Sequence, residues 1–237
     1  MRENMKKSVL LLSLLAVMVA SASAKKPVYV HIVGDETAAE MTAMEDMNDS
    51  AAIGWGQVLR DYVSDIEVIN RAVPATTSRA LLTQGDWNDI IANASRGSIL
   101  LIQLGHHEYD EANGQTYSTL VEFENNLLMM VETAQKKKLR VVLLTPTTKR
   151  FFYDNEYYPR HGAYAEGVRR VAQQQHLPLI DVEAMSRENV ADAGEDASAV
   201  YFAAGKDVEL SEEGARMVAR YIAEQAKELK IKGLYTK

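Results

Sequence analysis

The stretch that most constrains the fold runs from Val28 to Glu40 and reads VYVHIVGDETAAE. Its first half is rich in β-branched apolar residues, a pattern typical of a buried strand. The apolar run stops at Gly34, and the polar residues Asp35, Glu36 and Thr37 lead into alanines that favour a helix. A buried strand that ends in a glycine turn and opens a helix is how α/β folds present a reactive group. We therefore expect an α/β fold with a site at this turn.

Four more apolar runs of strand length follow, and stretches of helical periodicity separate them. We predict strands at residues 28–33, 66–70, 98–104, 140–145 and 177–182, and helices at 54–63, 119–137, 163–174 and 211–230. Strands that alternate with helices imply a parallel sheet covered on both faces. Five such strands suit a three-layer, flavodoxin-like order with the site at the carboxyl ends of the strands. The chain shows no internal repeat or linker, so we expect one domain.

The first 24 residues have the pattern of a secretory signal peptide. A basic start precedes an apolar run from Val9 to Ala20, and small residues at Ala22–Ala24 form a cleavage site before Lys25. The predicted mature domain is therefore 25–237, located in the periplasm or outside the cell. The chain has no cysteine, which excludes a lipoprotein anchor and a disulfide framework.

The charge of the chain excludes several classes of partner. The formal net charge is −7, and removal of the leader, which carries three basic residues and one acidic residue, would take it to −9. This balance argues against nucleic acid and against anionic membrane surfaces. An acidic polysaccharide would need a local basic patch. Lys149, Arg150 and Arg160 are candidates for such a patch, and solvated surface charge is the alternative reading of these residues.

Several short motifs occur in an order and spacing that are specific together. They are Gly34-Asp35-x-Thr37-Ala38, Gly54-Trp55-Gly56-Gln57, Asn70-x-Ala72, Gln103-Leu104-Gly105-His106, Leu144-Thr145-Pro146, Arg150-Phe151, His161-Gly162-x-Tyr164, Pro178-Leu179-Ile180-Asp181 and Ser211-Glu212-x-Gly214-Ala215. On these motifs the chain resembles the SGNH (GDSL-type) hydrolases. More narrowly, it resembles the rhamnogalacturonan acetylesterase branch from Val28 to about Tyr221. The resemblance implies the SGNH hydrolase fold and descent from carbohydrate esterases.

The resemblance also implies a Ser-His-Asp triad, and this chain lacks all three residues. Matched by position, the nucleophilic serine is Glu36, the aspartate is Lys206 and the histidine is Glu209. A shift of one residue would restore an aspartate, Asp207, but would put Leu210 in place of the histidine. Loss of triad members typically lowers turnover by about 10⁴- to 10⁶-fold. Acetyl transfer through a serine is therefore not available to this chain.

The oxyanion hole of the family is altered as well. The resemblance assigns it to the backbone N–H of Glu36, the N–H of Ala75 at a family glycine, and the side chain of His107 at a family asparagine. Ala75 keeps its N–H but adds a Cβ, and His107 still carries a hydrogen-bond donor. We expect this hole to survive in part.

Three alternatives stay open for Glu36. Its carboxylate suits a helix N-terminus, where it would be a cap without chemistry. Paired with Glu209, it would form two carboxylates able to act on a glycosidic bond. With His107 and Glu209 it would offer ligands for a divalent metal, although the spacing is not a metal motif. We expect no metal and no cofactor.

Five residues of the same loops are candidates for substrate binding. They are Asp35, Thr37, Trp55, His106 and Arg150. Trp55 suits stacking on a sugar, and the alternative is a core aromatic between two glycines. The alternative for His106 is a structural role.

These observations favour a secreted, catalytically degenerate relative of rhamnogalacturonan acetylesterases that retains affinity for pectin-type polysaccharide or acetylated oligosaccharide. The competing hypothesis is an active carbohydrate hydrolase or esterase with non-standard chemistry that uses Glu36, His107, Lys206 and Glu209. The sequence does not give the ligand or the oligomeric state.

Overall fold

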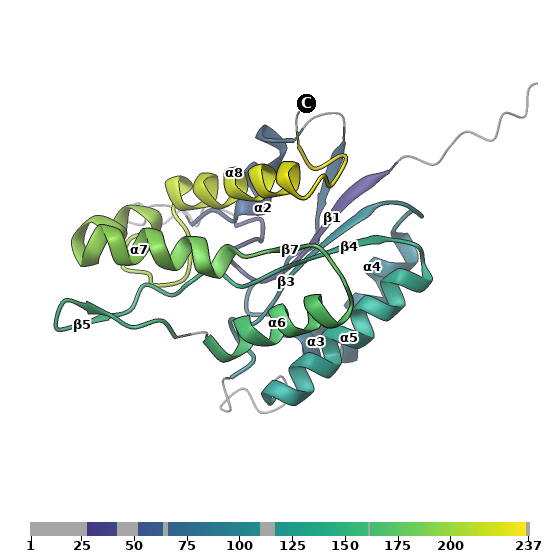
Figure 1. Cartoon of the computed structure of the whole chain (residues 1–237), viewed down its shortest axis with the longest axis horizontal. Coiled ribbons are helices and arrows are strands. Elements are labelled where there is room, and N and C mark those ends of the chain that lie inside the picture. Colours follow the sequence, from purple (N-terminus) through teal and green to yellow (C-terminus); the bar gives the residue numbers. More distant parts are fainter. Residues whose placement is uncertain (1–27, 42–51, 64–65, 110–116, 161, 236–237) are drawn as a thin grey trace, which may run out of the picture.

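A parallel sheet between two helical layers organises the structure, a computed structural model that describes residues 28–41, 52–63, 66–109, 117–160 and 162–235 (Figure 1). Its strands are β1 (Tyr29–Val33), β2 (Glu67–Asn70), β3 (Ile99–Gln103), β4 (Arg140–Leu144) and β7 (Leu179–Ile180). The order is β2-β1-β3-β4-β7 and every pair is parallel. The predicted five-stranded, flavodoxin-like sheet is confirmed. The predicted signal peptide lies outside the described residues.

The helices of the described residues are α2 (Trp55–Val58), α3 (Ser78–Thr83), α4 (Asp86–Asn93), α5 (Leu120–Lys136), α6 (Gly162–Gln174), α7 (Val182–Ser198) and α8 (Glu212–Glu228), with 3-10 turns η1 (Leu59–Asp61) and η3 (Ala199–Tyr201). Helices α5, α6 and α8 begin and end close to the residues that periodicity predicts. Side-chain caps fix the starts of two long helices: Thr119 accepts from the backbone of Glu122 at α5, and Ser211 from that of Gly214 at α8.

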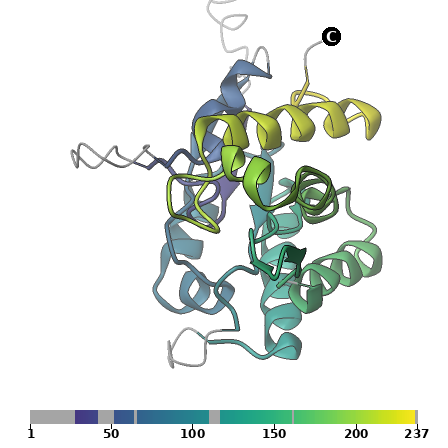
Figure 2. The ribbon, with the colours of Figure 1, turned by 90° about the vertical axis from the view of Figure 1, so that its left-hand side faces the viewer.

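The strands bury both faces because successive side chains point to opposite sides of the sheet. In β3, Ile99 and Leu101 pack into a core under α2 and α8, whereas Leu100 and Ile102 pack into a second core under α4, α5 and α6. Seen from the end that carries the β5–β6 hairpin (Phe152–Tyr153, Glu156–Tyr157), α8 lies on one side of the sheet and α5 and α6 on the other (Figure 2). In the described part of the chain, no helix is both long and apolar enough to cross a membrane.

Several elements depart from the prediction. Helices α3, α4 and α7 and the β5–β6 hairpin were not predicted, and β7 is only two residues long. Helices α3 and α4 are short, and α7 is interrupted by Gly194 at φ 76°, ψ 179°. None of the three therefore has a long periodic apolar face. Residues 35–39 form a turn in which the N–H groups of Ala38 and Ala39 donate to Asp35 O. The helix that we expected to start there is a turn instead.

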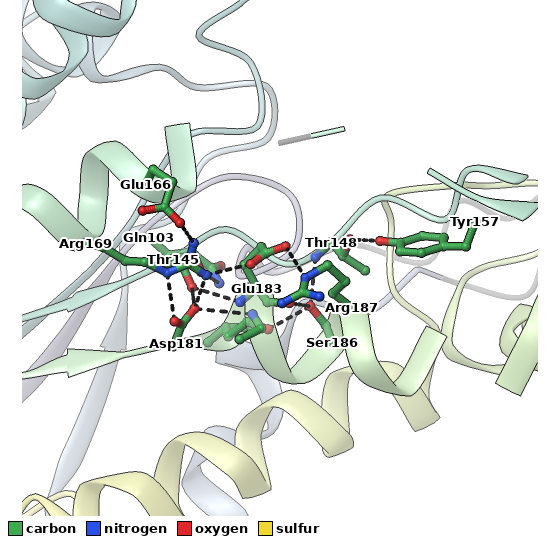
Figure 3. A network of polar contacts seen from close by, with 12 residues as sticks. Gln103, Thr145, Thr148, Tyr157, Glu166, Arg169, Asp181, Glu183, Ser186 and Arg187 are labelled. Carbon is green, nitrogen blue, oxygen red and sulfur yellow. Dashed lines mark hydrogen bonds and ion pairs between the residues drawn. The ribbon is translucent and has the colours of Figure 1, made fainter. Parts of the chain in front are cut away.

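A polar network joins the carboxyl ends of β4 and β7 to α6 and α7 (Figure 3). Arg169 donates to both carboxylate oxygens of Asp181, at 2.8 and 2.7 Å, and to Glu183 at 2.6 Å. Thr145 Oγ1 donates to Asp181 Oδ1 at 2.9 Å and accepts the N–H of Glu183 at 2.8 Å. Because Thr145 O also accepts from Gln103 Nε2, this network holds the edge of the sheet on which the site is built.

Candidate functional site

The turn after β1 is held by buried polar contacts. Asp35 Oδ1 accepts from the backbone N–H of Thr37 at 3.0 Å and lies 2.7 Å from its hydroxyl. The same hydroxyl lies 3.0 Å from Gln103 Oε1, to which Trp55 Nε1 donates at 2.8 Å. All four side chains are fully buried. Trp55 is therefore a core aromatic, as the alternative reading has it, and neither it nor Thr37 offers a surface to a bound sugar.

Glu36 brings the three predicted oxyanion-hole positions together. Its Oε2 accepts from the backbone N–H of Ala75 at 3.0 Å, and His107 Nε2 lies 2.7 and 2.8 Å from its two carboxylate oxygens. Ala75 lies in the loop after β2 and His107 in the loop after β3. These two strands flank β1, which carries the turn with Glu36. The carboxylate is thus bound by two of the groups that the motifs predict as oxyanion donors. Of the three alternatives for Glu36, the helix cap does not fit, because these partners come from other loops and residues 35–39 are a turn.

The contact between Glu36 and His107 favours the charged form of each side chain. Burial alone would raise the pKa of Glu36, but the hydrogen bond from His107 and the nearby charges of both histidines lower it to about 2. Burial lowers the pKa of His107, but its hydrogen bond to Glu36 and the charge of that carboxylate outweigh burial and raise it. A carboxyl group of such low pKa stays ionised and is poorly suited to act as a general acid. This weakens the glycosidase alternative.

The backbone at Ala75 adopts a conformation that glycine favours. Its φ is 57°, in the left-handed region that glycine adopts without strain and alanine does not. The preceding residues are fixed to the first turn, since the N–H of Val73 donates to Gly34 O at 2.9 Å. The backbone N–H of Ala75 is therefore held toward Glu36 by a loop that is fixed to the first turn and strained at Ala75 itself.

The other two triad positions are not joined to Glu36. Lys206 Nζ lies 3.8 Å from Glu209 Oε1, and both side chains are substantially exposed. Among the described residues, neither makes a hydrogen bond or ion pair with Glu36, Ala75 or His107. Their loop lies along the same edge, because Leu210 O accepts from the N–H of Ile53 at 2.9 Å. The predicted contact between Glu36 and Glu209 is therefore not among the contacts of the structure.

Asp35 and His106 lie beside Glu36 and below the surface. His106 Nε2 lies 2.8 Å from Thr147 O and therefore donates to it. Asp35, Glu36 and His106 each offer one possible ligand atom, and these atoms lie within 4.8 Å of one another. This set differs from His107, Glu36 and Glu209, the alternative that the sequence left open beside the expectation of no metal. One sequence signal points to this set: Asp35 and Glu36 follow the predicted strand β1, and His106 follows the predicted strand β3. These two strands pair in the sheet.

Glu108 is a buried carboxyl group of the same loop that sequence reasoning did not single out. It accepts from the backbone N–H of Ser78 at 2.6 Å and from its hydroxyl at 3.0 Å. Burial raises the pKa of Glu108 to about 7, although the hydrogen bonds from Ser78 and Ser118 oppose this rise. The contacts join the start of α3 to the loop after β3, which is a positioning role.

Two basic side chains lie against aromatic rings, and one of them, Lys149, is close enough to the site to act on its histidines. Lys149 contacts the hydroxyl of Tyr109 and lies 4.9 Å from the centre of its ring, and Arg160 lies 3.7 Å above the ring of Phe151. Burial, helped by the charge of Lys149, lowers the pKa of His106. At His107 burial and Lys149 act in the same direction, but the contact with Glu36 outweighs them and the pKa is raised. Arg150 is instead engaged within the chain.

The contacts of Arg150 link three segments of the fold. Its side chain donates to Glu195 O at 2.6 Å and to Ser198 Oγ at 3.2 Å, and it lies 3.8 Å from Asp207 Oδ1. A guanidinium with these partners is positioned to hold α7 and the loop before α8 together, and it has less capacity for a ligand.

Comparison with known proteins identifies the family. Residues 32–217 match the GDSL-like lipase/acylhydrolase family. The chain belongs to this family. The match spans the turn with Glu36, the loops with Ala75 and His107, and the segment with Lys206 and Glu209, so all five residues lie within the matched region.

Relatives of this GDSL-family chain include carbohydrate esterases. It is 27% identical over 220 residues to the rhamnogalacturonan acetylesterase RhgT of Bacillus subtilis, covering 86% of this chain and 92% of that one. It is 24% identical over 208 residues to the probable rhamnogalacturonan acetylesterase YesY of the same organism, covering 85% and 93%.

Solved structures confirm the fold. The crystal structure of YXIM from B. subtilis has a TM-score of 0.76 at 21% identity, and the match covers 88% of this chain and 58% of that one. The acetylxylan esterase Axe2 of Geobacillus stearothermophilus has a TM-score of 0.62 at 17% identity, covering 85% and 95%. The SGNH hydrolase fold expected from the motifs is therefore present in this chain.

Proposed function

We propose that this GDSL-family protein is a catalytically degenerate relative of rhamnogalacturonan acetylesterases that binds acetylated pectin-type polysaccharide. The observation that carries the first half of the proposal is the bound state of Glu36. An ionised carboxylate replaces the nucleophile and accepts hydrogen bonds from Ala75 N–H and from His107. An ester carbonyl would have to displace this carboxylate before it could use either donor.

The expected loss of turnover is large. Loss of the triad lowers turnover by about 10⁴- to 10⁶-fold, and loss of one oxyanion donor by about 10²- to 10³-fold. These effects overlap and are not additive, but either alone is enough to make serine-type acetyl transfer negligible. Lys206 and Glu209 bind each other at 3.8 Å and do not supply a base to this site.

Binding of an acidic polysaccharide is supported by the names of the relatives and by the border of the site. RhgT and YesY are named as acetylesterases of rhamnogalacturonan. Lys149 beside the histidines and Arg160 over Phe151 provide positive charge next to partly exposed aromatic rings. Such a border suits uronate carboxylates and sugar rings, and it offsets locally the net charge of −7.

The competing hypothesis, turnover by non-standard chemistry with Glu36, His107, Lys206 and Glu209, is favoured by one observation. Glu36 and His107 are in direct contact, as an acid/base pair would be. With a pKa of about 2, however, Glu36 is a weak base. We keep this hypothesis as the alternative outcome of the experiment below.

The experiment measures acetate release and binding side by side. Acetylated rhamnogalacturonan and a small activated acetate ester are incubated with wild type, with Glu36→Ala, and with Glu36→Ser combined with Lys206→Asp and Glu209→His. We expect no turnover by wild type and measurable turnover by the restored variant. The matched control is the Lys206→Asp, Glu209→His double variant, which lacks the nucleophile.

Binding is measured by calorimetry with acetylated and de-esterified oligosaccharides, in EDTA. Acetate release by wild type that Glu36→Ala abolishes would overturn the degenerate assignment in favour of the alternative. Absence of binding to either oligosaccharide would overturn the ligand class.

The proposal includes secretion. Residues 1–24 have the composition of a signal peptide. The relative RhgT is named for a polysaccharide, rhamnogalacturonan, which fits an enzyme or binding protein that works outside the cytoplasm. Mass spectrometry of the protein recovered from the periplasm and from the medium would test this, with a mature N-terminus at Lys25 as the expected result. Recovery of the full-length chain in the cytoplasm alone would contradict it.

A further inference from the structure

We propose that Asp35, Glu36 and His106 form a binding site for one divalent transition-metal ion, of which Zn²⁺ and Mn²⁺ suit the donors best. The three residues offer two carboxylates and one imidazole, and the possible ligand atoms lie within 4.8 Å of one another. Ligands of one such ion lie roughly 2.0–2.2 Å from it, so any two are at most about 4.4 Å apart. Side-chain shifts of a few tenths of an ångström would complete the site.

An unsatisfied buried oxygen points independently to a ligand. Asp35 is fully buried, and its Oδ1 is occupied by the N–H and hydroxyl of Thr37. Among the described residues, no hydrogen-bond donor reaches Asp35 Oδ2. A buried carboxylate oxygen without a partner is costly, and coordination of a cation is one way to satisfy it.

The charges of the cluster also favour a cation. Asp35 and its chain neighbour Glu36 are both buried carboxyl groups. Among the described residues, Glu36 makes one ion pair, with His107 at 2.7 Å, and Asp35 makes none. Two adjacent buried carboxylates with a single directly paired imidazole are short of positive charge, and a divalent ion would supply it.

The imidazole of His106 is oriented as metal-bound histidines are. Its Nε2 donates to the backbone carbonyl of Thr147, which leaves the lone pair of the neutral ring on Nδ1. A backbone carbonyl that fixes the tautomer in this way is the usual outer partner of a histidine ligand. Glu36 retains acceptor capacity, because Ala75 and His107 use part of the roughly four lone-pair sites of its carboxylate.

The choice of metal follows from the donors. One nitrogen and two carboxylate oxygens suit Zn²⁺ or Mn²⁺, whereas Ca²⁺ requires about 6–8 oxygen ligands, which this cluster does not provide. Three protein ligands leave further coordination positions for water or for an oxygen of a bound molecule. The site concerns the cation alone and does not depend on polysaccharide binding.

The test is metal uptake by the whole protein. Protein freed of metal with EDTA and passed into metal-free buffer is titrated with Zn²⁺, Mn²⁺ and Ca²⁺ by calorimetry, and retained metal is counted by mass spectrometry after dialysis. We expect one equivalent of Zn²⁺ or Mn²⁺ and none of Ca²⁺. Asp35→Asn, which keeps the shape of the side chain, should weaken binding at least about tenfold. Glu209→Gln, from the same edge but outside the cluster, is the matched control and should bind as wild type does.

A measurement on wild type keeps the test decisive if Asp35→Asn fails to fold. X-ray absorption of the Zn²⁺-loaded protein should show one imidazole and otherwise oxygen ligands. An ion held by two or more imidazoles, uptake that Asp35→Asn leaves unchanged, or absence of stoichiometric uptake would each overturn the proposal. Since these readouts need no ester or oligosaccharide, their failure would leave the proposed function standing, and failure of oligosaccharide binding in EDTA would leave the metal site standing.

Discussion

Replacement of Glu36 by alanine tests whether its carboxylate supports the fold through Ala75 and His107. The carboxylate accepts from the N–H of Ala75 at 3.0 Å and from His107 Nε2 at 2.7 Å, and only 8% of the residue is exposed. Hydrogen bonds to an ionised group contribute about 1.5–3 kcal/mol each. Water can reach Ala75, which is exposed, so we take the lower end for both and expect a loss of about 3 kcal/mol.

The lowered pKa of Glu36 corresponds to a stabilisation of similar size. The pKa falls from 4.5 to about 2 in the folded protein, and each unit corresponds to about 1.4 kcal/mol, so the shift corresponds to about 3 kcal/mol. Because the folded pKa is depressed, this stabilisation is present above the unfolded pKa near 4.5 and is lost as the pH falls through about 2.

The assay is urea unfolding at pH 7 in EDTA, followed by circular dichroism. We expect Glu36→Ala to lower the free energy of unfolding by about 3 kcal/mol, or the melting temperature by about 6–12 °C for a domain of this size. Glu209→Ala is the control and should change stability by less than about 1 kcal/mol, because its partner Lys206 is 45% exposed. An effect of Glu36→Ala no larger than that of the control would refute the assignment of Ala75 and His107 as its stabilising partners.

Three further predictions concern the surroundings of the site. Ala75→Gly should raise the free energy of unfolding by about 0.5–1 kcal/mol, since relief of the strain at φ 57° exceeds the entropy that glycine adds to the unfolded chain. A lower free energy of unfolding in a urea titration would contradict this. Burial raises the pKa of Asp181, but the hydrogen bond from Arg169 outweighs it and lowers that pKa, so its stabilisation should be complete above about pH 3.9 and vanish as pH falls through the folded value. The stability difference between wild type and Asp181→Asn should therefore shrink in acid, and a constant difference would contradict the ion pair. Trp55→Phe should lower the free energy of unfolding by about 2–3 kcal/mol, because it removes the donor to Gln103 Oε1 and leaves a cavity. An effect below about 0.5 kcal/mol in thermal unfolding would show that this hydrogen bond is unimportant.

The sequence alone predicts most of the framework of this protein. Continuous apolar runs such as 98–104 and 140–145 predict buried parallel strands, and each deviates from the observed strand by one residue or so at its ends. The reason is physical: a strand covered on both faces must be apolar throughout, so the run itself carries the information. Helices α5 and α8 are predicted equally well because both carry a long apolar face.

Short elements are predicted poorly because their sequences contain little local information. Helix α3 spans six residues, and α7 contains Gly194 in a non-helical conformation. These segments are helical because of what they pack against, and periodicity over so few residues cannot show that.

The chemistry of the site was decided by tertiary structure. The motifs locate Glu36, Ala75 and His107 at one edge of the sheet, but nothing local indicates that the carboxylate of Glu36 binds both partners, 39 and 71 residues away in the chain. A hydrogen bond depends on distances of a few tenths of an ångström, whereas a motif fixes only order along the chain.

The same limit explains the metal-site prediction and the reading of Trp55. The sequence left open a set of Glu36, His107 and Glu209 as ligands, whereas the pairing of β1 with β3 in the sheet brings His106 beside Asp35 and Glu36. The sequence thus determined which strands form and to which family the chain belongs. Only the packing of the sheet determined which polar groups meet at its edge, because burial and ligand geometry are set by segments that are distant in sequence.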